Sequence, residues 1–147
     1  MTLSERLNED MKQAMKSQDK FRLSVIRMIR SSIKNIEIDQ RRTLDDGEVI
    51  DILSREIKQR KDALQEFEKA GRSDLVESAQ AEIAIISEYL PKQLTEEELQ
   101  SIIQETIREV GASSKADLGK VMSALMPRIK GRADGKLVNR LVQQQLQ

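Results

Sequence analysis

The sequence contains no cysteine and no histidine. A chain without these residues cannot form disulfides, cannot use a thiolate nucleophile or an imidazole general base, and lacks the usual ligands of zinc. We therefore expect no thiolate or imidazole catalysis and no zinc site. No other catalytic residue, metal site or cofactor is expected either. The absence of cysteine also suits a reducing compartment such as the cytosol.

Aromatic residues are scarce, at 2% of the chain, and only six glycines and two prolines are present. This composition disfavours a sheet protein, while apolar residues recur at helical spacing from end to end. The sequence therefore predicts an all-α protein. The stretch "MTLSERLNED" has early acids and no long apolar run, which is typical of neither a secretory signal nor a membrane span. We expect a soluble cytoplasmic protein with no membrane partner.

Four amphipathic helices are predicted in the first 90 residues, over about 2–17, 19–39, 46–70 and 73–90. Thr2 and Glu5 have the spacing of a capping box at the first start. Gly71 is expected to end the third helix, and Ser73 to cap the fourth. Short connections between such helices are typical of a bundle or of paired hairpins.

Pro91 in "EYLPKQLTEEEL" disfavours a helix at its own position and at the residue before it. Thr95 and Glu98 form another capping-box pattern, so a new helix begins there. We place a domain boundary at this proline, which predicts an N-terminal helical domain over 1–90 and a small three-helix domain over 91–147. The expected helices of the second domain span about 95–110, 117–129 and 134–146, with Pro127 kinking or ending the middle one.

The chain carries 25 basic and 25 acidic residues, but they are unevenly distributed. Residues 111–147 hold seven bases and two acids. Several of these bases flank Gly131 and Asp134, which mark a turn into the last helix. Backbone N–H groups at a helix start favour an anion, so the turn is a candidate phosphate site. A solvated charged face that keeps a small domain soluble is the alternative, and charge alone leaves it open.

The segment "LMPRIKGRADGKLVNRLV" resembles the C-terminal tail of the B subunit of the tRNA-dependent aspartyl/glutamyl amidotransferases. The matching residues are Met126, Lys130, Gly131, Arg132, Ala133, Asp134, Leu137, Val138, Asn139 and Leu141. Over its whole length the chain resembles the YqeY family of stand-alone proteins with such a tail, through "LSERLNEDMKQAMK", "LSREIKQRKDALQEFEKAGRSDLV" and "EYLPKQLTEEEL". Pro127 and Gly135 depart from the tail pattern, in which a base and a proline are common.

The resemblance implies an all-helical fold in two parts and a link to tRNA-dependent amide transfer, the reaction of a carbon–nitrogen ligase with glutamine as amide donor. The chain itself has no recognisable catalytic site for that reaction. Ser113, Ser114 and Lys115 only superficially suggest a serine–lysine relay, and capping by Ser114 together with Asp117 explains them better. No GxxxxGK[ST] phosphate loop is present.

The leading hypothesis is a binding protein for tRNA or another folded RNA. It assigns phosphate contacts to Lys120, Arg128, Lys130, Arg132, Lys136 and Arg140. Arg27, Arg30 and Lys34 share one helix stripe, which either extends the RNA contact or is plain surface. Glu56 and Arg60 can pair at i, i+4 on a solvated face. The alternative function is a protein-interaction module that docks to an amidotransferase or another translation-related partner.

Overall fold

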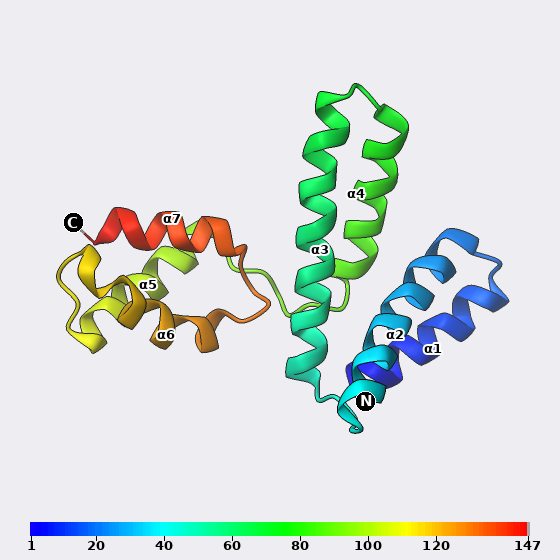
Figure 1. Cartoon of the computed structure of the whole chain (residues 1–147), viewed down its shortest axis with the longest axis horizontal. Helices are drawn as coiled ribbons and strands as arrows, with labels where there is room; N and C mark the ends of the chain where they lie inside the picture. The colour runs from blue at the N-terminus through cyan, green and yellow to red at the C-terminus, as the bar shows by residue number, and fades with distance from the viewer. Residues whose placement is uncertain (147) are drawn as a thin grey trace. The chain divides into compact units, whose positions relative to one another are not determined.

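The computed structural model describes residues 1–146, so Gln147, the last residue of the predicted second domain, lies outside it. Within the described range the chain forms seven α-helices, one short 3₁₀-helix and no strand (Figure 1), and the all-α class is confirmed. The chain divides into two compact units, one ending at Leu90 and the other starting at Pro91. That each unit folds as an independent domain stays a prediction.

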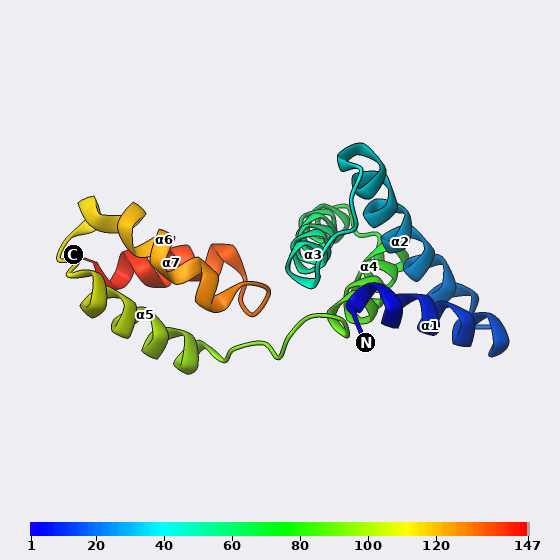
Figure 2. The same ribbon diagram turned by 90° about the horizontal axis from the view of Figure 1, so that it is seen from below.

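The first unit consists of two helical hairpins. Helices α1 (Leu3–Lys16) and α2 (Lys20–Gln40) form one hairpin, and α3 (Asp46–Lys69) and α4 (Ser73–Ser87) form the longer one. Figures 1 and 2 show α3 and α4 running side by side. Helix α2 also packs against α3 and α4, so one apolar core joins the hairpins. Its fully buried members include Leu7, Ile26, Ile29, Val49, Leu53 and Ile86.

Local capping explains where several helices begin. Capping boxes join Thr2 with Glu5, Asp45 with Glu48, and Thr95 with Glu98. In each box the first side chain accepts a hydrogen bond from the backbone three residues on, and the glutamate side chain accepts one in return, which satisfies two otherwise unpaired N–H groups.

The start of α4 differs from the sequence prediction. Ser73 is the first residue of the helix, and the capping position is held by Arg72, which makes no side-chain capping bond. The prediction of a Ser73 cap is therefore wrong. Gly71 does take the left-handed conformation expected after a helix end, with a φ of +69°.

The second unit contains α5 (Glu96–Val110), the 3₁₀-helix η1 (Lys115–Asp117), α6 (Leu118–Ile129) and α7 (Gly135–Gln145). Helix α5 packs against both α6 and α7, around Leu99, Ile103, Val121, Leu125, Val138 and Leu141. Pro127 lies inside α6, and the helix continues to Ile129, so the proline does not end it. Within residues 1–146, no helix is both long and apolar enough to cross a membrane.

Arg60 lies in a polar network between the helices of the first unit, where a solvated ion pair was expected. Its guanidinium bonds to carboxylate oxygens of Glu56 at 2.7 Å and Glu82 at 2.8 Å, and to Sδ of Met28 at 2.7 Å. The side chain of Arg60 is only 13% exposed. The predicted ion pair of Glu56 with Arg60 therefore exists. The pair faces α4 and the Met28 sulfur of α2, and it does not lie on a solvated face.

Candidate nucleic-acid interface

A short turn between α6 and α7 brings three of the six predicted RNA-binding residues near one another. Lys130 leaves the end of α6, and Gly131 turns the chain with a φ of +71°. The N–H of Arg132 then bonds back to the carbonyl of Ile129 at 2.8 Å. Lys130, Arg132 and Lys136 consequently lie within one turn and the first residues of α7.

Arg132 fastens this turn to the segment that precedes α5. Its Nε donates to the carbonyl oxygen of Lys92 at 3.2 Å, and its own carbonyl accepts from the N–H of Leu94 at 2.8 Å. The side chain of Gln93 adds a bond to the carbonyl of Gly131 at 2.7 Å. Arg132 therefore has a structural role within the second unit, which its sequence context did not indicate.

The start of α5 places acids beside this basic turn. Hydrogen bonds from the backbone and side chain of Thr95 lower the pKa of Glu98, and the nearby positive charges of Lys92 and Arg132 lower it further. Glu98 thus partly balances the charge of the turn. At the start of α7, the carboxylate of Asp134 already accepts from the N–H of Lys136 at 3.0 Å. An RNA phosphate at this turn would therefore have to rely on side chains more than on that backbone N–H.

Arg128 is directed to the α5 side of the unit. One nitrogen of its guanidinium donates to Oγ1 of Thr106 at 3.1 Å, and another pairs with the carboxylate of Glu109. Thr106 is fully buried and donates its own hydroxyl to the carbonyl of Ile102 at 2.8 Å. Arg128 hence ties α6 to α5, and the structure separates it from the other predicted residues.

Helix α7 presents a polar face without a single acid. Val138, Leu141 and Val142 are buried against the core of the unit. The opposite side, which we call the α7 face, consists of four exposed residues: Lys136, Asn139, Arg140 and Gln143. No aspartate or glutamate occurs between Gly135 and Gln145. The α7 face therefore offers cationic and amide groups with no acid of its own helix to compete for them.

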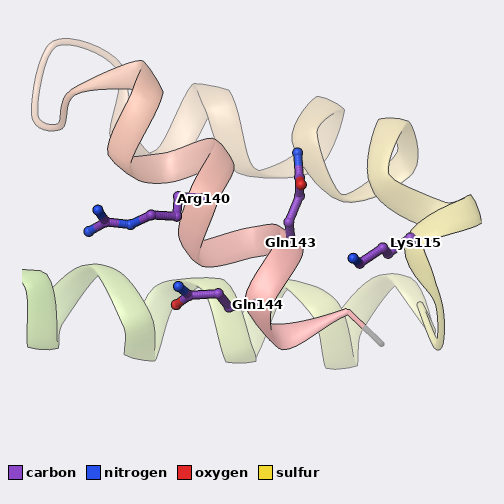
Figure 3. A pocket seen from close by; sticks show the side chains of 4 residues that line it. All are labelled: Lys115, Arg140, Gln143 and Gln144. Carbon is purple, nitrogen blue, oxygen red and sulfur yellow. The ribbon is translucent and has the colours of Figure 1, made fainter.

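A hollow of about 630 Å³ adjoins the α7 face, and the four described residues that line it are polar or cationic. Lys115 comes from η1, while Arg140, Gln143 and Gln144 come from α7 (Figure 3). Arg140 is among the residues predicted to contact RNA, whereas Lys115 is not. The signal that could have included it was its place among the seven bases of residues 111–147.

Lys120 does not line the hollow and lies next to Asp117. Bonds from the backbone N–H groups of Ser113 and Ser114 lower the pKa of Asp117, and the charge of Lys120 adds to that effect. The Asp117 carboxylate thus holds the backbone of the turn before η1, where Ser114 is the N-cap residue. The hydroxyl of Ser114 makes no capping bond, so the expected cap by that side chain is wrong.

Nothing in the described part of the chain resembles a metal centre, because no three acidic residues gather in a way that could hold an ion. The stretch with Ser113, Ser114 and Lys115 uses its backbone N–H groups in the bonds to Asp117. The six predicted RNA-binding residues do not form one cluster. Lys130, Arg132 and Lys136 share the turn, Arg140 lines the hollow, and Lys120 and Arg128 each lie apart.

Comparison with known proteins assigns the chain to a family. The model of a family described as "Yqey-like protein" matches residues 4–146. A curated relative from Lachancea thermotolerans is 48% identical over 85 residues, which cover 57% of this chain and 46% of that protein. A relative from Pyrenophora tritici-repentis is 31% identical over 142 residues, which cover 95% of this chain and 78% of that protein. The chain thus spans about half the length of the first relative.

Both relatives carry the name "Altered inheritance of mitochondria protein 41, mitochondrial", and so does one from Kluyveromyces lactis that is 43% identical over 84 residues, 56% of this chain and 45% of that protein. These names contradict the expectation of a cytoplasmic protein, which is wrong. That expectation rested on missing cysteine and on early acids. A lack of disulfides is compatible with every reducing compartment, so it did not separate the cytosol from the others.

Proposed function

We propose that this chain, which belongs to the Yqey-like protein family, binds the phosphate backbone of a folded RNA through its second unit. The resemblance of "LMPRIKGRADGKLVNRLV" to an amidotransferase tail makes tRNA the RNA to test first. The observation that carries the proposal is the α7 face together with the hollow beside it, where Lys115 and Arg140 lie among amide side chains.

Charge favours a phosphate ligand at this surface. Residues 111–147 hold seven bases against two acids, and both acids are engaged with the backbone. Asp117 accepts from the N–H of Ser113 at 2.9 Å, and Asp134 accepts from the N–H of Lys136. Lysine and arginine side chains that neutralise phosphates release condensed counterions, which supplies most of the affinity of such contacts.

The kind of RNA contact follows from the residues that are missing. The aromatic residues Phe21, Phe67 and Tyr89 all belong to the first unit, so the second unit has no ring on which a base could stack. Amide groups such as that of Gln143 can bond to phosphate oxygens and to ribose 2′-hydroxyls. We therefore propose recognition of the shape and backbone of a folded RNA and not of single-stranded bases.

The link to amide transfer enters the proposal only through a partner. The chain has no cysteine, and Ser113 and Ser114 lie in a capping turn without a recognisable relay. In this proposal the chain holds tRNA, and any nucleophile that releases ammonia from glutamine belongs to a separate enzyme. The purified chain should then release no ammonia from glutamine in the presence of tRNA and ATP.

Binding of fluorescently labelled tRNA to the full-length chain tests the proposal, measured by anisotropy at several salt concentrations. If the second unit makes about three to five phosphate contacts, those contacts should contribute roughly −2 to −5 to the slope of log affinity against log salt. Lys115→Glu with Arg140→Glu should weaken binding by about tenfold or more, because two attractive charges become repulsive.

Lys58→Glu with Lys61→Glu is the matched control, since it makes the same charge change at exposed positions of α3 in the first unit. Circular dichroism should show that both variants keep their helices. The proposal is overturned if the parent chain does not bind tRNA at low salt. The assignment of the surface is overturned if the double variant of the hollow binds as the control does.

A further inference from the structure

The outward side of α2 carries a straight line of basic and small hydroxyl residues. Lys20, Ser24, Arg27, Ser31 and Lys34 follow one another at alternating steps of four and three positions, and all five are exposed. This spacing places them along one side of a helix. We call this line the α2 stripe.

The opposite side of α2 is committed to the core of the first unit. Its buried residues are Val25, Ile26, Ile29 and Ile33. Two neighbouring arginines are also engaged inside the unit. Arg22 pairs with Glu88 at 2.6 Å, and Arg30 directs its guanidinium to Sδ of Met11 on α1 at 2.8 Å. The predicted stripe of Arg27, Arg30 and Lys34 is corrected accordingly, because Arg30 is half-buried and Lys20 belongs in its place.

The three cations of the α2 stripe have no internal partner. Among the described residues, none forms an ion pair with Lys20, Arg27 or Lys34, although the neighbouring Arg22 is paired with both Asp19 and Glu88. No acid occurs from Lys20 to Ile36. Successive cations are seven residues apart, which is about 10 Å along a helix. The serines between them are too small to shield the charges, so the stripe is an evenly spaced positive line.

We propose that the α2 stripe is a second phosphate-binding surface, on the first unit, and that it contacts the sugar–phosphate backbone of the same RNA that the second unit binds. This inference rests on the proposed function. A line of separate cations matches a polyanion with repeated charges better than it matches one small anion, which converging side chains would enclose. The hydroxyl of Ser31 can donate or accept hydrogen bonds at the same backbone, whereas Ser24 already donates its hydroxyl hydrogen to the carbonyl of Phe21 at 2.8 Å and can only accept.

A membrane fits α2 less well than RNA does. A helix that lies in a membrane interface buries its apolar side among the lipids. In α2 that side is already occupied, since Ile26 and Ile29 are fully buried in the protein core. Between Lys20 and Lys34 only Phe21 is a large exposed apolar residue, at 40% exposure beside the first lysine.

The test compares two full-length variants with the same loss of charge. Lys20→Gln, Arg27→Gln and Lys34→Gln neutralise the α2 stripe with a residue that keeps good helix propensity. The control is Arg55→Gln, Lys58→Gln and Lys61→Gln, at exposed positions of α3 where acids alternate with the bases. Binding of labelled tRNA is measured against salt, and circular dichroism confirms the fold of both variants.

We expect the stripe variant to bind tRNA about tenfold more weakly and to reduce the magnitude of the salt slope by roughly 2 to 3, because three phosphate contacts are lost. The control should change the slope by less than about one contact. Lys20→Arg with Lys34→Arg should bind as the parent does, since the charge is retained.

The outcomes separate this inference from the proposed function. Loss of binding in the variant of Lys115 and Arg140 but not in the stripe variant overturns the stripe alone. Loss of binding in the stripe variant but not in the variant of Lys115 and Arg140 supports the stripe and overturns the hollow as the principal RNA-binding site. No tRNA binding by the parent overturns both. A further outcome is that the parent and the control sediment with anionic phospholipid vesicles, whereas the stripe variant does not but still binds tRNA as the parent does. The α2 stripe is then a membrane surface, and the inference is also overturned.

Discussion

The phenol of Tyr89 donates a hydrogen bond of 2.5 Å to the carboxylate of Asp10, 79 positions earlier in the chain. Arg6 lies over the same ring, 4.6 Å from its centre, and donates to the carbonyl of Glu88 at 2.9 Å. Arg22 holds the side chain of Glu88 as well. These contacts fasten the residues that follow α4 to both helices of the first hairpin.

This relationship predicts a fall in stability at high pH. Burial raises the pKa of Tyr89, and the bond to Asp10 raises it further, so the folded chain keeps the phenol neutral where the unfolded chain ionises it. The contribution of Tyr89 is therefore complete below about pH 10 and is lost as the pH rises above that value. Urea unfolding at neutral pH and above pH 10 should show this loss in the parent.

Tyr89→Phe provides the control for that experiment, because Tyr89 is the single tyrosine of the chain. The variant should be less stable by about 1 to 3 kcal/mol at neutral pH, since the Asp10 carboxylate loses its donor. Its stability should then fall less steeply above pH 10. Equal slopes for parent and variant would contradict the assigned cause.

Glu48 predicts sensitivity to acid at the start of α3. Hydrogen bonds from Arg42, helped by the backbone N–H of Asp45, lower the pKa of Glu48 from 4.5 to about 2. A carboxylate with a lowered pKa stabilises the fold above its unfolded value and loses this effect as the pH falls from about 4.5 to 2. Glu48→Gln keeps an acceptor for the Asp45 N–H but removes the charge. Stability of the variant should depend less on pH in that window, and Glu68→Gln, an exposed change near the end of the same helix, should not alter the dependence.

Arg60 predicts a large stability effect at a position that the sequence marks as surface. Arg60→Ala leaves Glu56 and Glu82 without their common partner, at side-chain exposures of 16% and 31%. We expect a loss of about 2 to 3 kcal/mol in urea unfolding, below the range for fully buried pairs because solvent reaches both acids. Lys69→Ala is the control: it removes the ion pair with Glu66, in which both side chains are about three-quarters exposed. This change should lower the free energy of unfolding by less than about 0.5 kcal/mol.

The division into two units predicts separable unfolding. Leu125 is fully buried in the second core and Ile86 in the first. Leu125→Ala and Ile86→Ala should each cost about 2 to 5 kcal/mol in their own unit. If the units are independent domains, Leu125→Ala lowers the melting temperature of the smaller unit only. The fluorescence of Tyr89 reports on the first unit, and its thermal transition should stay at the parental temperature. One shared transition in both variants would contradict independent folding.

Helix starts were predictable from the sequence because a capping box is a contact between residues three positions apart. Thr2 with Glu5 and Thr95 with Glu98 formed as expected. The two predicted serine caps did not form, because the presence of a serine near a helix start does not fix whether its side chain makes the capping bond. Arg72 holds the capping position before Ser73, and Ser114 holds the capping position of η1 without a side-chain capping bond.

The roles of long basic side chains were less predictable. Arg30, Arg60 and Arg128 have sequence surroundings like those of exposed cations, yet each reaches a partner on another helix. Such partners depend on which helices pack together, and hydrophobic spacing does not specify this. For the same reason the sequence does not predict that Lys115 of η1 and Arg140 of α7 line one hollow.

The way the helices pair has a kinetic consequence. The most extensive contacts join neighbours in the chain, α1 with α2, α3 with α4, and α5 with α6. The first helix of each pair begins with a capping box, so its start is encoded locally. Each hairpin can then assemble before any distant part of the chain arrives, at little cost in loop closure. Helical proteins rich in local contacts fold within about microseconds to milliseconds, and we expect the first unit to refold on that timescale.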